Sequence, residues 1–198
     1  MEYYIYNIPL FVVNEPEEGV DLPGFCQEVE EILPVSLLDN VDVVYVGDFQ
    51  DLQDKNAAYT HGAIYMAAHE PTNFDMLENF VHETAHSLED RYGWEIYDDA
   101  MADEFKGKRE RLYHLLQGAG FPADKTLFSQ IEYNKDFDEY LAYDVGYPTL
   151  MSLTMGLFTS PYGATSLQEY FANGFEKYFL DNPETVRKTS PILYQKIE

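Results

Sequence analysis

Residues 72–93 read TNFDMLENFVHETAHSLEDRYG, and the expected fold follows from this stretch. Its apolar residues recur with a spacing that favours one helical face: Phe74, Leu77, Val81 and Leu88. Thr72 followed by Asp75 is typical of a capping box at a helix start, and Gly93 is a common residue just after a helix end. The stretch therefore predicts one long amphipathic helix over residues 73–92.

Residues 82–86 of this helix, His-Glu-Thr-Ala-His, form an HExxH motif. Side chains four residues apart lie on one face of a helix, so both imidazoles can bind the same metal ion. Glu83 then lies beside the coordination position that a water would occupy. The chain has only 5 His, which makes a chance HExxH within a predicted helix uncommon. The alternative is a polar ridge that the two histidines share with Glu78 and Glu89.

A catalytic zinc site needs three protein ligands and one open position, so a third ligand must lie elsewhere. Three other histidines are candidates, although each is more typical of an ordinary surface or core histidine: His61, His69 and His114. Glu89 and Asp90 follow His86 by about one turn, where they suit acceptors for an imidazole N–H better than ligands of the same ion. A solvated helix face is the alternative for both.

Glu169 is a better placed candidate for the third ligand. It lies in the first turn of a strongly apolar helix, residues 166–175, that can pack against the HExxH helix and present a carboxylate to it. Ser166 and Glu169 also have the spacing of a capping box, in which the glutamate only caps the helix start. Spacing alone favours neither interpretation.

The remaining elements are short strands followed by helices. Strands are predicted by β-branched and aromatic runs at residues 3–13, 41–49 and 62–68, the last two separated by a polar loop with Asp54, Lys55 and Asn56. Helices are predicted over residues 24–33, 96–117, 137–143, 149–158 and 167–180, with a short helical tail after Pro191. Strands early and helices late indicate an α+β fold, and the absence of repeats and linkers indicates one domain over residues 1–198.

Composition excludes several classes of protein. The 198 residues contain 45% hydrophobic and 16% aromatic residues, enough for a globular core. Lys and Arg total 12 against 36 Asp plus Glu, and a net charge of -24 repels phosphate backbones and anionic lipid. We therefore expect neither nucleic acid nor a membrane as a partner.

The compartment is expected from cysteine use and the N-terminus. A single cysteine, Cys26, excludes an internal disulfide. No stretch has the length of a membrane span, and the first residues lack the basic start of a signal peptide. These features favour a cytoplasmic protein, while a secreted form trimmed of its signal would have the same sequence. A monomer is the expected oligomeric state.

The motifs together resemble a known family. The HExxH motif, Tyr162-Gly163 and residues 169–175, EYFANGF, are similar to the anthrax lethal factor-like metallopeptidases, a gluzincin family that includes the Pro-Pro endopeptidases. In that family a helix of E-[YF]-F-A-E-A-F type begins with a glutamate ligand, and a tyrosine precedes this glutamate by seven residues. Tyr162 precedes Glu169 by seven residues. The resemblance covers roughly residues 62–198, and residues 190–194 fall where the family has a final helix.

This resemblance implies a zincin-like metallopeptidase fold, with a small N-terminal mixed sheet, a mostly helical C-terminal part and an active-site cleft between them. It implies Zn²⁺ held by His82, His86 and Glu169. Glu83 is then the general base, and the Tyr162 hydroxyl stabilises the oxyanion. The expected activity is that of a zinc metalloendopeptidase acting on a protein or peptide. The strand at residues 62–68 is a candidate edge for main-chain pairing with a peptide, or else a packed interior strand.

Two features depart from the family pattern. Asn173 stands where the family has a second glutamate, and Gly174 replaces an alanine at a helix cost of about 1 kcal/mol. The segment between His86 and Tyr162 also exceeds the expected length, which implies additional walls on the cleft. Two other functions therefore stay open: a noncatalytic zincin-like binding protein, and an acidic mimic of nucleic acid that occupies a basic protein.

Overall fold

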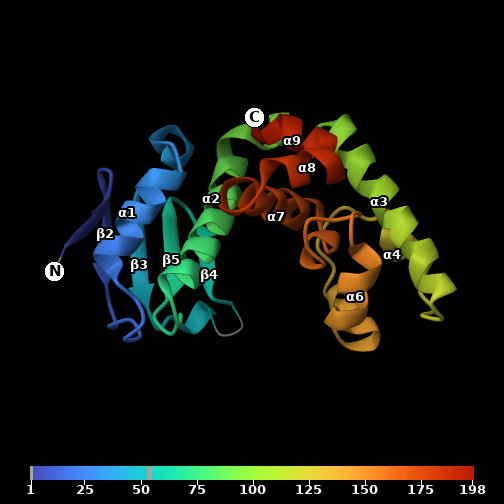
Figure 1. Ribbon diagram of the computed structural model, residues 1–198, viewed down its shortest axis with the longest axis horizontal. Helices are drawn as coiled ribbons and strands as arrows, with labels where there is room; N and C mark the ends of the chain where they lie inside the picture. The colour runs from blue at the N-terminus through green and yellow to red at the C-terminus, as the bar shows by residue number, and fades with distance from the viewer. Residues whose placement is uncertain (1, 53–54) are drawn as a thin grey trace. The chain divides into compact units, whose positions relative to one another are not determined.

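The computed structural model describes residues 2–52 and 55–198, which form two compact units, residues 1–93 and 94–198 (Figure 1). Helices account for 60% of the chain, and a five-stranded mixed sheet confirms the predicted α+β class. Asp54, expected in a polar loop, lies outside the described residues. The single-domain organisation of residues 1–198 stays a prediction.

The first unit contains the sheet, with strand order β1-β2-β3-β5-β4. Its strands are β1 (Tyr3–Ile5), β2 (Ile8–Val12), β3 (Val43–Gly47), β4 (Ala57–Thr60) and β5 (Ala63–Ala67). The central strands β2, β3 and β5 are parallel, and β1 and β4 pair antiparallel at the two edges. The strands predicted at residues 41–49 and 62–68 are confirmed as β3 and β5.

Two predictions about the strands were wrong. Residues 3–13 form a hairpin, β1 and β2, instead of one strand, because the chain turns at Tyr6 with a positive φ of 55°. The Tyr6 hydroxyl lies 2.8 and 2.9 Å from the backbone oxygens of Glu30 and Leu33 and shares its one proton between them, which holds the turn on the end of α1 (Leu22–Ile32). The second difference is β4, a four-residue strand in a region expected to be only a connection.

Helices α1 and α2 (Asn73–Ile96) lie across one face of the sheet (Figure 1). The rings of Phe25 and Phe80 join them edge to face, with centroids 5.8 Å apart. Leu77, Val81 and Leu88 of the predicted apolar face are buried, whereas Phe74 is 52% exposed. The buried apolar residues of α2 up to Gly93 are Met76, Leu77, Phe80, Val81, Ala85 and Leu88.

The two ends of α2 fit the prediction differently. The expected cap is confirmed at the start, where the Thr72 hydroxyl oxygen accepts from the Asp75 N–H at 3.2 Å. The helix does not end at Gly93 but continues to Ile96, a buried residue. Asp98 then caps the next helix by accepting from the Met101 N–H at 3.0 Å.

The second unit consists of helices. These are α3 (Asp99–Gly118), α4 (Lys125–Ser129), α5 (Lys135–Glu139), a π-helical segment η3 (Tyr140–Gly146), α6 (Tyr147–Thr154), a 3₁₀ turn η4 (Tyr162–Ala164), α7 (Leu167–Leu180), α8 (Pro183–Thr189) and α9 (Pro191–Ile197). The bounds predicted for α7 and the helical tail after Pro191 are confirmed, whereas α4 and α8 were not predicted. Among the described helices, none is both long and apolar enough to cross a bilayer.

Arg109, 1% exposed, joins three parts of the second unit. Its guanidinium donates to the backbone oxygens of Ala164 and Thr165 at 2.7 and 3.1 Å, and also to that of Leu127. Its carbon lies 3.9 Å from the centroid of the Phe137 ring. Because buried carbonyls and a buried cation both need partners, this side chain fixes η4 and the start of α7 relative to α3.

Gly174 has a packing role that the sequence did not reveal. A Cβ at this position would overlap Leu193 Cδ2 and lie 3.0 Å from Leu193 Cδ1, and Leu193 is fully buried. We therefore expect Gly174→Ala to lower the free energy of unfolding by about 1–3 kcal/mol through overpacking, although alanine favours a helix by about 1 kcal/mol. Urea unfolding of purified protein measures this change.

Gly107→Ala is the matched control. Gly107 lies inside α3, and a Cβ added to it would have nothing within 4 Å. Alanine should raise stability there by up to about 1 kcal/mol, because it restricts the unfolded chain without a clash. Equal stabilisation by both substitutions would contradict the packing role of Gly174.

Candidate metal centre

His82 and His86 lie together on α2 in the first unit, both half-buried. Their Nε2 atoms are 3.3 Å apart, and their ring centroids 5.0 Å apart. Two ligands about 2.0–2.1 Å from a tetrahedral zinc ion lie about 3.3–3.4 Å from each other. The imidazoles therefore already have the separation that two ligands of one zinc ion need.

The buried side of the motif is satisfied within the helix. The Thr84 hydroxyl donates to the Phe80 oxygen at 2.8 Å, and the Ser87 hydroxyl donates to the Thr84 oxygen at 2.7 Å. Both polar residues are fully buried, as is Ala85 between them. With these hydroxyls paired, the helix can bury this face and turn the histidines to the other side.

Glu89 orients one of the imidazoles. Its Oε1 lies 2.7 Å from Nδ1 of His86, the distance of a hydrogen bond. A carboxylate acceptor favours the tautomer with its proton on Nδ1, which leaves the Nε2 lone pair for a metal. Glu89 thus takes the position predicted for an acceptor of the imidazole N–H. Asp90 does not, because it accepts from the Tyr59 hydroxyl at 2.8 Å.

Glu83 is held by the edge of the sheet. Its Oε2 accepts from the backbone N–H of Tyr59, in β4, at 2.7 Å. Strand β5 is an interior strand between β3 and β4, so residues 62–68 do not provide the free edge. The edge beside the predicted general base belongs to β4 instead.

Glu169 and Tyr162 both lie in the second unit, on α7 and η4. The Ser166 hydroxyl oxygen accepts from the Glu169 N–H at 3.1 Å, which confirms Ser166 as the cap of α7. The observed cap bond involves the backbone N–H of Glu169. The Asn173 side-chain amide donates to the backbone oxygen of Glu169 at 2.8 Å and accepts from the Ser160 hydroxyl. Asn173 therefore connects α7 with the segment before Tyr162.

Tyr162 is surrounded by groups that keep its hydroxyl protonated. Burial raises the pKa of Tyr162, and the nearby carboxylates of Glu169 and Asp138 raise it further. Tyr133 donates to Asp138 Oδ2 at 2.8 Å, and partial burial together with this bond raises the pKa of Tyr133 to about 12. The electrostatic effect of Tyr147 also raises the pKa of Tyr162.

This cluster contains residues that the sequence analysis missed. Tyr133, Asp138 and Tyr147 lie in the long segment between His86 and Tyr162, and no motif distinguishes them among 17 tyrosines and 36 acidic residues. Each lies near enough to Tyr162 in the second unit to raise its pKa. The segment that appeared as an insertion thus supplies the surroundings of the predicted oxyanion donor.

The three remaining histidines lie outside α2. His61 has a positive φ of 48° in the turn before β5, and His69 lies in the turn after β5. His114 is on α3 in the second unit. All three are exposed, as is typical of surface histidines.

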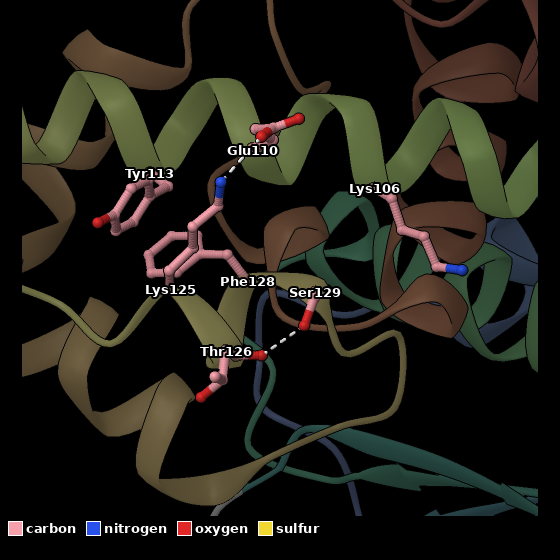
Figure 2. A pocket seen from close by; sticks show the side chains of 7 residues that line it. All are labelled: Lys106, Glu110, Tyr113, Lys125, Thr126, Phe128 and Ser129. Atoms are coloured by element: carbon pink, nitrogen blue, oxygen red, sulfur yellow. Dashed lines mark hydrogen bonds and ion pairs between the residues drawn. The ribbon is translucent and has the colours of Figure 1, made fainter.

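A pocket of about 380 Å³ lies between α3 and α4 of the second unit (Figure 2). Its lining includes Tyr113, Phe128 and Lys106. Lys125 and Glu110 also line it, and Lys125 Nζ forms an ion pair with Glu110 Oε1 at 3.2 Å (Figure 2). None of the residues predicted for the metal site lines this pocket, so it is a separate feature of the unit.

No family model matches the chain, and neither a curated protein nor a solved structure has significant similarity to it. The resemblance to lethal factor-like peptidases therefore stays an expectation carried by the motifs. Function has to be inferred from the side chains of the site itself.

The Glu89 contact leads to a prediction about metal affinity. Glu89→Ala removes the acceptor that orients His86, and loss of such a partner typically weakens metal binding by roughly 10- to 100-fold. Chelator competition with the purified protein measures the zinc affinity. Asp90→Ala is the control, because it removes the same charge from the next residue but contacts Tyr59. Equal affinities of the two variants would contradict the orienting role.

Proposed function

We propose that the protein is a zinc metalloendopeptidase that hydrolyses peptide bonds in a protein or peptide substrate. The observation that supports it is the geometry of α2, where two Nε2 atoms are 3.3 Å apart and Glu89 engages the other nitrogen of His86. Two ligands of one zinc ion require this separation of their nitrogen atoms, whereas the nitrogens of ordinary surface histidines are under no such requirement. Glu83, between them in sequence, is the group expected to act on water.

The proposed ligands are His82, His86 and Glu169. Two neutral imidazoles and one carboxylate form a donor set that suits catalytic zinc, which keeps a fourth position open. Glu169 lies in the first turn of α7, where the Ser166 hydroxyl caps the helix through the Glu169 backbone N–H. That Glu169 joins the histidine pair belongs to the proposal, as do the zincin-like fold and its cleft.

When bound, zinc would supply a water of lowered pKa and a Lewis acid for the scissile carbonyl. Glu83 accepts a proton from this water as its oxygen adds to the carbonyl carbon. Glu83 then returns the proton to the leaving nitrogen as the C–N bond breaks. Tyr162 donates a hydrogen bond to the substrate oxyanion, and its raised pKa keeps the necessary proton in place.

Glu83→Gln tests the reaction separately from metal binding. The substitution should leave zinc content and fold unchanged, since Glu83 is not a proposed ligand, and should lower turnover by at least about 100-fold. Cleavage of an unbiased peptide library identifies the substrate, and metal analysis measures the zinc. A variant with near-normal turnover would exclude this mechanism. Stoichiometric zinc without turnover in the wild type would favour the noncatalytic binding protein.

Glu169→Gln tests the third ligand. A neutral amide is a much poorer partner for zinc, so the variant should bind zinc more weakly and lose most activity. Its melting temperature should rise on adding excess zinc, because metal that binds only the folded state stabilises it by mass action. Chelator competition and melting curves at two zinc concentrations measure both effects.

Ser166→Ala is the control for Glu169→Gln. It removes the cap of α7, with an expected cost of about 1 kcal/mol, and leaves the carboxylate of Glu169 in place. Zinc affinity of the folded protein should stay near that of the wild type. If Glu169→Gln binds zinc as tightly as the wild type, Glu169 is not a ligand.

A further inference from the structure

Strand β4 is an edge of the sheet, and its free side is defined by its pairing with β5. Ala58 pairs with Tyr65, and the Ala67 N–H donates to the Asn56 oxygen at 2.8 Å. In an antiparallel pair, alternate residues direct their N–H and C=O to the neighbouring strand. The backbone N–H and C=O groups of residues 56, 58 and 60 therefore point to β5, while those of Ala57 and Tyr59 point away from it.

The outward N–H of Tyr59 is the donor that Glu83 accepts from at 2.7 Å. Hydrogen bonds to an ionised carboxylate are among the stronger ones in proteins. The Tyr59 side chain fixes the same strand further along α2, since its hydroxyl donates to Asp90 Oδ2 at 2.8 Å. One residue of β4 thus contacts α2 at two points that are seven residues apart.

An open strand edge is also a site where an extended peptide adds as a further strand by main-chain pairing. Such a peptide needs the outward N–H groups of β4 as donors for its own carbonyls. The Tyr59 N–H is one of them, and in the resting structure it is occupied by the carboxylate of Glu83. A peptide carbonyl and Glu83 therefore compete for one donor.

We propose that this competition couples substrate recognition to catalysis. An extended peptide that pairs with β4 places a carbonyl oxygen on the Tyr59 N–H, and Glu83 is released to accept the proton of water. The inference rests on the proposed function and names its substrate class, peptides long enough to pair with β4 at Tyr59. Shorter substrates leave Glu83 bound to the strand and are turned over slowly.

Tyr59→Pro removes this backbone donor from the strand, together with the ring and hydroxyl of Tyr59. Proline has no N–H, and an edge strand accepts it where the N–H faces away from the sheet. Tyr59→Ala is the matched control, because it also loses the ring and hydroxyl but keeps the N–H. Kinetics with a blocked dipeptide and a ten-residue library peptide containing the same scissile bond compare the two variants.

Relative to Tyr59→Ala, the proline variant should have a kcat about 3- to 10-fold higher for the dipeptide and a KM about 3- to 10-fold higher for the long peptide, the effect of one hydrogen bond. Opposite effects on the two substrates support the exchange. An equal fall in kcat for both would overturn it, since the Tyr59 N–H would then only orient Glu83 productively.

Amide hydrogen exchange provides a measurement that requires neither activity nor the proline variant. In the zinc-loaded wild type, the Tyr59 amide should exchange more slowly than that of Ala57, which faces the same side. Glu83→Ala should remove this difference, and adding the long peptide with its scissile amide reduced to a methylene amine should protect both amides. Persistent Tyr59 protection in Glu83→Ala, or no protection by the peptide, overturns the inference.

The two proposals fail in different ways. If the protein holds zinc and cleaves peptides while the Tyr59 amide behaves like that of Ala57, only the exchange is wrong. If zinc and cleavage are absent while Glu83→Ala still releases the Tyr59 amide and an unmodified ten-residue peptide protects it, β4 binds peptides and the peptidase proposal is wrong.

Discussion

The one-turn spacing of His82 and His86 on α2 is the constraint on which the candidate site depends. Rotation of this helix by one residue, about 100°, would turn the imidazoles toward the core and expose the apolar face. Met76, Phe80, Val81 and Ala85 are fully buried, so burial of their side chains fixes the rotation. The bonds of Tyr59 in β4 to Glu83 and Asp90 restrain the helix further. The site is therefore held by the same packing that forms the first unit.

In the second unit, a buried cation holds the segment that carries the proposed site residues. A buried guanidinium is costly unless its donors are paired, and Arg109 has backbone carbonyls on both η4 and α4 as acceptors. That cost makes the arrangement specific, because a displacement of η4 would deprive a buried cation of the Ala164 acceptor. Tyr162 and Glu169 lie on either side of the two anchored residues, Ala164 and Thr165. In a chain with a net charge of -24 and only 12 Lys and Arg, Arg109 thus holds the segment just before the N-terminus of α7.

The sequence predicts what is periodic or local and misses what depends on tertiary packing. The HExxH helix, the Ser166 cap and the contact of Glu89 with His86 all involve residues within four positions of each other. Strand β4 was missed because its four residues, Ala-Ala-Tyr-Thr, are too few to show alternation. Its partnership with Glu83 spans 24 residues and has no local pattern. The prediction that the helix ends at Gly93 was wrong, because the buried Ile96 extends the apolar pattern past the glycine.

The two departures from the family pattern have structural reasons in this chain. A glutamate at position 173 could accept from the Ser160 hydroxyl, as Asn173 does. It would lack the amide N–H that donates to the backbone oxygen of Glu169. An alanine at position 174 would collide with Leu193 of α9. Both residues are therefore fitted to neighbours within the second unit. They change what packs around α7 and leave the carboxylate of Glu169 unaltered, so they are not evidence of a decaying site.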